Sequence, residues 1–129
     1  MEKQLLKKLL VYEFYINNKH KVLEEYFVNE LRPLWDTIKK AHEKYETDLT
    51  PEWVNQLYKT YNPVASSAAT INIANLLDDI GHEDTPPDKL ASDILSELFK
   101  KEKARQVADI AIGVINGEKN IKELVDFVD

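Results

Sequence analysis

The sequence predicts an all-α protein: a small helical bundle followed by a long antiparallel helical hairpin and a short C-terminal linker helix. No stretch alternates apolar and polar residues over a useful length, so strand signals are absent. The three glycines and five prolines of the 129 residues stand almost entirely where helix boundaries are needed. Between those boundaries, apolar residues recur at the spacing of one helix face.

Residues 1–63 predict a helical globular head. We expect helices over about 2–15, 19–26, 30–46 and 51–61. The third has the clearest period, with one stripe formed by Leu31, Leu34, Trp35, Ile38, His42 and Tyr45. The segment Thr50-Pro51-Glu52 predicts the start of the fourth, because it combines a capping hydroxyl, a proline at the first helical position and an acid in the first turn.

Residues 64–117 predict a helical hairpin of the same domain. Its first helix spans about 64–80, and its second, over about 88–116, would be roughly 45 Å long. That length exceeds the width of so small a domain, so we expect the hairpin to protrude. The run Lys100–Arg105 in the second helix offers almost nothing to bury. It indicates either a solvated face or a contact strip for a partner domain.

Residues 118–129 predict the start of a linker helix. The segment Asn120-Ile121-Lys122-Glu123 has the pattern of a capping box with Asn in the N-cap role. The helix that it opens carries an apolar stripe formed by Ile121, Leu124, Val125 and Val128. Because nothing in the 129 residues obviously remains for this stripe to cover, we expect it to dock on a partner beyond them.

Charge and composition limit the classes of function. The net charge of −6 is the wrong sign for a domain whose main work is to grip phosphates. Residues 1–45 carry 9 basic and 7 acidic side chains, whereas residues 46–129 carry 8 and 16, so a weakly basic face on the first half stays a lesser alternative. Without cysteine, no disulfide or thiolate site can form, which agrees with a cytoplasmic protein. The N-terminus predicts no signal peptide or membrane span.

No enzymatic motif emerges. The segment from Gly113 to Lys119 has one residue too few between its glycines for a phosphate-binding loop and follows a helix instead of a strand. The acidic group around Asp78 and His82 lacks the ligand spacing of a metal motif, which favours a solvated helix end. The histidines are scattered, and His42 fits a partly buried core position. We therefore expect no catalytic, cofactor-binding or metal-binding residue.

Other polar and aromatic residues have structural interpretations. The pair Ser66-Ser67 has no nearby base and fits a cap for the helix that follows. Several aromatic residues could stack on nucleotide bases, but their spacing favours packing in the core. These residues are Trp35, Tyr45, Tyr58 and Tyr61.

The order of several segments resembles the N-terminal domain of DnaB-type replicative helicases, especially divergent phage versions. The matching segments are the apolar start Leu5–Leu10, the pair Tyr26-Phe27, Arg32, Leu34-Trp35, Ile38, the stretch Asp48–Leu57, Arg105 before Val107–Ala111, and Lys122–Phe127. The resemblance covers essentially the whole chain in order, length and pattern. Departures include Leu31 in place of a frequent His, the unusual Pro33 and a short loop before the hairpin.

The resemblance implies an N-terminal collar domain in a hexameric DNA helicase of a bacterial cytoplasm. Such domains pair through their hairpins, form a ring, recruit primase and touch DNA only indirectly, while the linker helix docks on a neighbouring subunit's motor domain. ATP and magnesium would belong to a C-terminal RecA-like motor domain outside these residues, so this domain would be non-catalytic and need no cofactor. On this hypothesis, self-association involves the hairpin residues Ile73, Leu77, Leu95, Leu98 and Phe99.

A second hypothesis is a stand-alone helical adaptor, such as a helicase loader or a regulatory binding protein. The reading frame distinguishes the two, because a helicase continues into a strand, a GxxxxGK[ST] loop and a helix. A third hypothesis, nucleic-acid binding by this domain itself, predicts an affinity that falls steeply with salt. The negative net charge argues against it.

Overall fold

A computed structural model describes residues 1–115, and all regular structure in that range is helical. The elements are α1 (Glu2–Leu9), α2 (Tyr12–Asn18), the 3-10 turns η1 (Lys19–Lys21) and η2 (Glu24–Tyr26), α3 (Arg32–Tyr45), α4 (Pro51–Tyr61), α5 (Ser67–Gly81) and α6 (Asp88–Ile115). The predicted all-α class is therefore confirmed. The linker helix predicted over 118–129, with its docking residues, lies outside the described residues.

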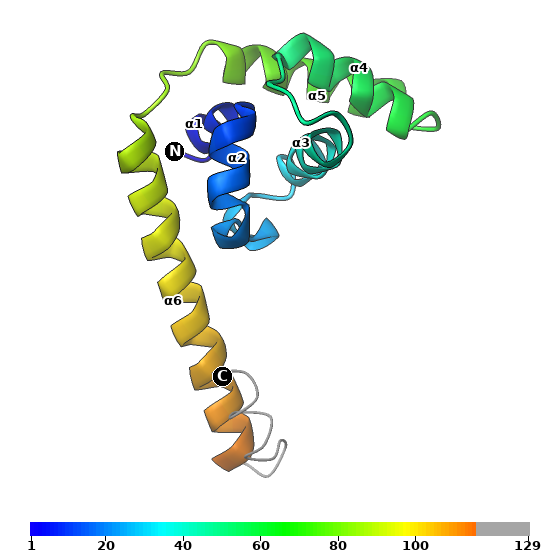
Figure 1. The fold of residues 1–129 in the computed structure, drawn as a ribbon. Coiled ribbons are helices and arrows are strands. Elements are labelled where there is room, and N and C mark those ends of the chain that lie inside the picture. The colour runs from blue at the N-terminus through cyan, green and yellow to red at the C-terminus, as the bar shows by residue number, and fades with distance from the viewer. Residues whose placement is uncertain (116–129) are drawn as a thin grey trace.

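Helices α1 to α5 form one unit, which we call the head (residues 1–81; Figure 1). Helix α3 packs on α4, α4 on α5, α5 on α1, and α1 on α2, so the five helices surround a common core. The most deeply buried apolar side chains come from several of them. They include Leu6 and Leu9 of α1, Leu34 of α3, Val54 of α4 and Ile80 of α5.

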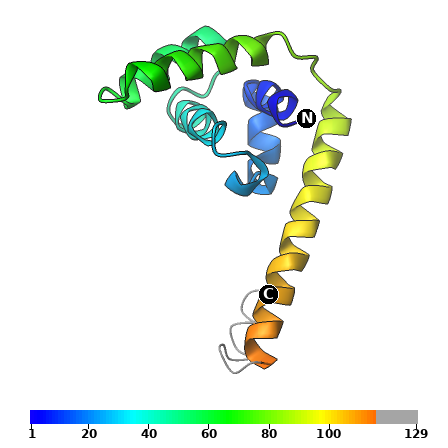
Figure 2. The same ribbon diagram turned by 180° about the vertical axis from the view of Figure 1, so that it is seen from behind.

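Helix α6 forms the second part of the molecule, which we call the arm (Asp88–Ile115). Its 28 residues correspond to about 42 Å at the usual helical rise. Figures 1 and 2 show the arm leaving the head after the loop 82–87, passing beside the head and continuing beyond it. No helix within residues 1–115 combines the length and the apolar character needed to cross a membrane.

The antiparallel hairpin predicted over 64–117 is not confirmed. Helix α5 lies across α1 and α4, whereas α6 contacts α1, α2 and η1 and runs in a different direction (Figures 1 and 2). The reason is that the apolar face of α5, which includes Ile73 and Leu77, is buried in the core of the head. The boundary predicted at residue 63 therefore moves to the loop after α5.

The single helix predicted over 2–15 is two helices, α1 and α2, separated at Leu10 and Val11. Val11 is extended, with ψ of 120°, and the break is held by the loop before α4. The Leu49 amide donates to the Leu10 carbonyl at 2.9 Å, and the Asp48 carboxylate accepts from the Tyr12 amide at 2.9 Å. A side chain 36 residues away thus caps α2, because a helix start leaves its first amides without partners.

The short helix predicted over 19–26 is also replaced, by η1 and η2 with extended residues between them. The predicted caps of α4 and α5 are confirmed, although α5 begins at Ser67 and not at the predicted residue 64. The Thr50 hydroxyl accepts from the Trp53 amide at 3.2 Å at the start of α4, and the Ser66 hydroxyl accepts from the Ala69 amide at 3.1 Å at the start of α5. These two caps fix where α4 and α5 begin.

Candidate interaction sites

The first half of the arm is attached to the head by apolar and polar contacts. Ala91 and Leu95 are fully buried against the core of the head. Close by, the Ser92 hydroxyl donates to Asn18 Oδ1 at 2.8 Å and accepts from Lys21 Nζ at 3.3 Å. An ion pair between Lys8 and Asp88 joins α1 to the first residue of the arm. These contacts set the direction in which the arm leaves the head.

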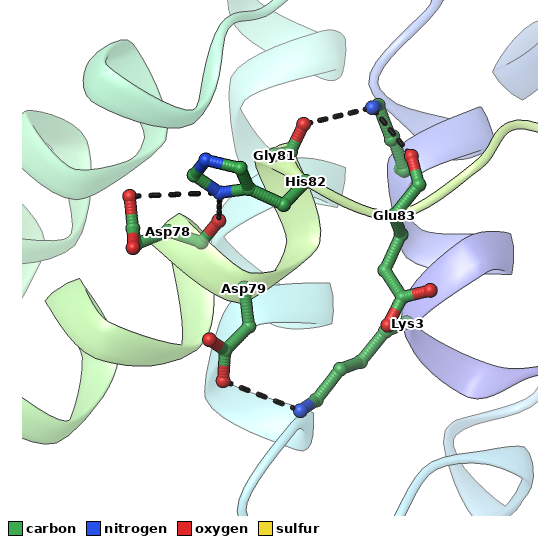
Figure 3. A network of polar contacts seen from close by, with 7 residues as sticks. Lys3, Asp78, Asp79, Gly81, His82 and Glu83 are labelled. Atoms are coloured by element: carbon green, nitrogen blue, oxygen red, sulfur yellow. Dashed lines mark hydrogen bonds and ion pairs between the residues drawn. The ribbon is translucent and has the colours of Figure 1, made fainter.

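Lysines of α1 hold the loop that precedes the arm (Figure 3). Lys7 Nζ donates to the carbonyls of Gly81 and Glu83, at 2.9 and 2.6 Å, and Lys3 Nζ lies 3.4 Å from an Asp79 carboxylate oxygen. A cation is favourable there because the last carbonyls of a helix are unpaired and carry partial negative charge. The acidic helix end is thus occupied by lysines of α1, and residues 1–115 contain no group of three or more metal-ligating side chains.

The middle of the arm carries an ion-pair ladder of Glu102, Arg105 and Asp109. The Arg105 guanidinium donates to Glu102 at 3.1 Å through Nε and to Asp109 at 2.7 Å through Nη1. Burial, followed by the carboxylates of Glu102 and Glu25, raises the pKa of Tyr26 to about 12. Since Glu25 and Tyr26 belong to η2, the head reaches the arm as far as this ladder.

Beyond the ladder, the arm exposes large apolar side chains. Ile112 is 56% exposed and Ile115 is 82% exposed. Single apolar residues on a surface are common and need no explanation. Here, however, both stand near the end of a helix that extends past the rest of the described structure (Figure 1). The end of the arm is therefore a candidate contact surface.

The residues predicted for self-association differ in how deeply they are buried. Ile73, Leu77 and Leu95 are buried in the core, so in this arrangement they do not reach another molecule. Leu98 and Phe99 are half-buried on the arm, and Leu98 packs against the core. The stripe predicted on the linker helix, Ile121, Leu124, Val125 and Val128, lies outside the described residues.

The head residues that carry the helicase resemblance have structural roles here. Phe27, Leu34, Trp35 and Ile38 are buried in the core, with the Phe27 and Trp35 rings in tilted contact at 6.0 Å. Arg32 Nε donates to the Phe27 carbonyl at 3.0 Å, which ties α3 to the segment before it. A pattern of this kind specifies packing, and it carries no information on a ligand.

His42 is a core residue, as its position on the α3 stripe predicts. Its Nε2 lies 2.6 Å from the Leu9 carbonyl, and its ring stacks on Tyr15 at 4.5 Å between centroids. Burial lowers the pKa of the imidazole below its usual value, although contacts with the Leu9 and Thr47 carbonyls and the Asp48 carboxylate oppose the shift. The neutral ring therefore joins α1, α2 and α3 and is closed to solvent.

Sequence reasoning missed an apolar groove between the end of α3 and α4. The groove measures about 350 Å³, and its wall is almost entirely apolar. It is lined by Tyr45, Thr47, Leu49, Trp53, Gln56 and Leu57. Tyr45 was expected in the core, yet its side chain is 48% exposed, and Trp53 is 55% exposed. The sequence did contain one signal of this surface: Trp53 falls next to the buried stripe of α4 and not on it.

Comparison of the chain with protein-family models, with curated proteins and with solved structures finds no match. Inference about function therefore depends on the residues and their arrangement.

Proposed function

We propose that the chain is the N-terminal collar domain of a DnaB-type hexameric replicative helicase, a non-catalytic module for ring assembly and for recruitment of primase or other partners. The observation that carries the proposal is the arm: a long helix that continues past the head and exposes Ile112 and Ile115 near its end. The order of head segments and the mid-helix Arg105 supply the link to this helicase class.

Physical reasons favour an assembly role for the arm. A single helix is only marginally stable in water, because most helical stability in proteins comes from packing of an apolar face. The part of the arm beyond Arg105 has no head helix beside it (Figures 1 and 2). Association with a second arm would cover its apolar residues, and a two-fold arrangement would use the same surface on both copies.

The burial of the predicted residues changes where self-association is proposed. Leu98 and Phe99 stay candidates because they are only half-buried. Ile112 and Ile115 join them, while Ile73, Leu77 and Leu95 are assigned to the core. The proposed surface therefore lies on the arm alone, and not on two helices of a hairpin.

Sedimentation equilibrium over a wide concentration range tests the proposal. We expect reversible self-association of the chain, and we expect Ile112→Ser to weaken it about tenfold, which corresponds to about 1.4 kcal/mol. Leu90→Ser is the matched control, because Leu90 is 50% exposed on the same helix but close to the head. A chain that stays monomeric at the highest concentration contradicts the collar role and favours the stand-alone adaptor.

A second measurement separates the collar from an enzyme. We expect the chain to hydrolyse no ATP, since the proposal places that activity in a motor domain outside these residues. Specific turnover that persists through purification would contradict the assignment. Continuation of the reading frame into a strand, a GxxxxGK[ST] loop and a helix would support the helicase over the adaptor.

A further inference from the structure

The groove between α3 and α4 has features of a peptide-binding site. Its volume of about 350 Å³ lies at the small end of the range of ligand sites. Two large aromatic side chains, Tyr45 and Trp53, stand at its wall with about half of their surface exposed. Tyrosine and tryptophan are enriched where protein partners bind, because they bury a large area and lose little conformational freedom.

The wall of the groove is fixed before any partner arrives. Residues 46–50, which connect α3 to α4, are held at both ends: the Glu46 amide donates to the His42 carbonyl at 3.2 Å, and Thr50 caps α4. Between them, Asp48 and Leu49 are bonded to the α1–α2 junction at 2.9 Å each. A rigid wall favours binding, because little ordering entropy is lost when the partner docks.

Glu46, the residue that follows α3, has a backbone conformation that is uncommon for a residue with a side chain. Its φ of 51° places it in the left-handed region, where it is the only non-glycine residue of the described chain. Glycine or asparagine usually occupies such a position after a helix, since a side chain there costs energy. Glu46 is exposed and stands in the chain between Tyr45 and Thr47, two residues of the groove wall.

The charges around the groove are mostly negative. Residues 44–57 contain three acidic side chains, Glu46, Asp48 and Glu52, and one basic side chain. That basic residue, Lys44, lies over the Tyr45 ring at 5.4 Å from its centroid. The Asp48 carboxylate accepts from the Tyr12 amide, so Glu46 and Glu52 are the two exposed acids that remain next to wall residues in the chain. An apolar wall with an acidic border is complementary to an apolar side chain flanked by positive charge.

We propose that this groove binds a short basic amphipathic segment of a partner protein, with an apolar anchor against Trp53 and Tyr45 and with Lys or Arg side chains near Glu46 and Glu52. The contact would also allow a partner cation to lie over an exposed aromatic ring. This proposal uses a surface of the head away from the arm and does not depend on the collar assignment.

Titration with synthetic peptides tests the proposal. The probe is a short capped peptide of Leu, Ala and Lys with helical periodicity, and its matched counterpart has Glu in place of every Lys. Trp53 emission and backbone amide shifts of residues 45–57 report binding, while the buried Trp35 gives a constant background. We expect saturable binding of the Lys peptide alone, with a blue shift of Trp53 emission and shifts confined to the groove.

Substitutions then locate the contact. Trp53→Ala should weaken binding of the Lys peptide about tenfold or more, as measured by the amide shifts. The double variant E46Q and E52Q should weaken it about twofold to fivefold and reduce its dependence on salt. The control Ile71→Ala removes another exposed apolar side chain, on α5 and outside the groove, and should leave the affinity unchanged.

Several results would overturn the proposal. Equal binding of the Glu and Lys peptides would show that charge does not select the partner. An affinity unaffected by Trp53→Ala would show that the peptide does not bind in the groove. Absence of binding by either peptide at millimolar concentration would contradict it directly. If Trp53→Ala instead abolished self-association of the chain without peptide, the occupant would be a second copy and the proposed partner would be wrong.

Discussion

The head and the arm are both helical, but they use their apolar residues differently. In the head, each helix has its apolar face buried against other helices, so that residues such as Leu6, Leu34 and Val54 are inaccessible to solvent. In the arm, fully buried apolar side chains occur near the start, at Ala91 and Leu95, and Ile112 and Ile115 are exposed near the end. Most stability should therefore come from the head, and the far part of the arm should contribute little.

This difference shows that an apolar stripe alone does not identify a contact surface. The stripe of α5 is as apolar as any part of the arm, yet α1 and α4 of the same chain cover it. What distinguishes the arm is the lack of a neighbouring head helix along its second half (Figure 2). The number of helices available to cover a stripe decides whether it faces the core or a partner.

The largest expected effect comes from creating a cavity in the head, and it tests the comparison between the head and the arm. We expect Leu34→Ala to lower the free energy of unfolding by about 2–5 kcal/mol, because it removes a fully buried side chain of α3 and leaves a void. Urea denaturation followed by circular dichroism measures the change. The matched variant in the arm is Ile112→Ala, for which we expect a change below about 0.5 kcal/mol in dilute solution. Equal losses from the two variants would contradict the division into head and arm.

A second, smaller effect depends on His42, which lies within the head. Because burial lowers its pKa in the folded state, the unfolded chain binds the proton at a higher pH than the folded chain does. The free energy of unfolding should therefore fall as pH drops below about 6.5, by at most about 1.36 kcal/mol per pH unit, until the folded pKa is reached. Urea denaturation between about pH 7.5 and about pH 5.5 covers the start of this window.

Two variants isolate the contribution of His42 from other titrating groups. His42→Phe keeps an aromatic ring beside Tyr15 and removes the proton site, so the slope of stability against pH should become shallower, whatever the cost to stability itself. His20→Asn replaces an exposed histidine of η1 and should keep the wild-type slope. A slope unchanged in His42→Phe would show that the pH dependence comes from elsewhere.

Local signals in the sequence were sufficient to predict several helices of the head. Helices α3 and α4 begin and end within a few residues of their predicted bounds, because Pro33, Thr50 and Pro51 act on the backbone next to them. The cap at Ser66 is likewise local and was also predicted correctly. The burial of His42 followed from its place on the periodic stripe of α3.

Features that depend on distant residues were not predictable in the same way. The break between α1 and α2 has no glycine or proline, and it exists because Asp48 and Leu49 supply partners to Tyr12 and Leu10. The path of α5 could not be read from its pattern either, since periodicity gives the apolar face and not the element that covers it. The groove was missed for the same reason: its two sides come from different helices, and Tyr45 has core spacing but a solvent-facing position.

The smallest expected effect concerns the ladder at the middle of the arm, where the head ends. Arg105→Gln removes both pairs of the ladder, with Glu102 and with Asp109, but Arg105 and Asp109 are exposed, so solvent screens these pairs. We therefore expect the urea midpoint to stay unchanged, while amide hydrogen exchange becomes faster in residues 106–115 and stays the same in α1 to α5. Lys100→Gln, which breaks only the single pair with Glu97, should leave exchange in residues 106–115 unchanged. Arg105 lies near Glu25 of η2. A clear fall in the urea midpoint for Arg105→Gln would therefore mean that Arg105 attaches the arm to the head. The boundary between head and arm would then lie closer to the end of α6.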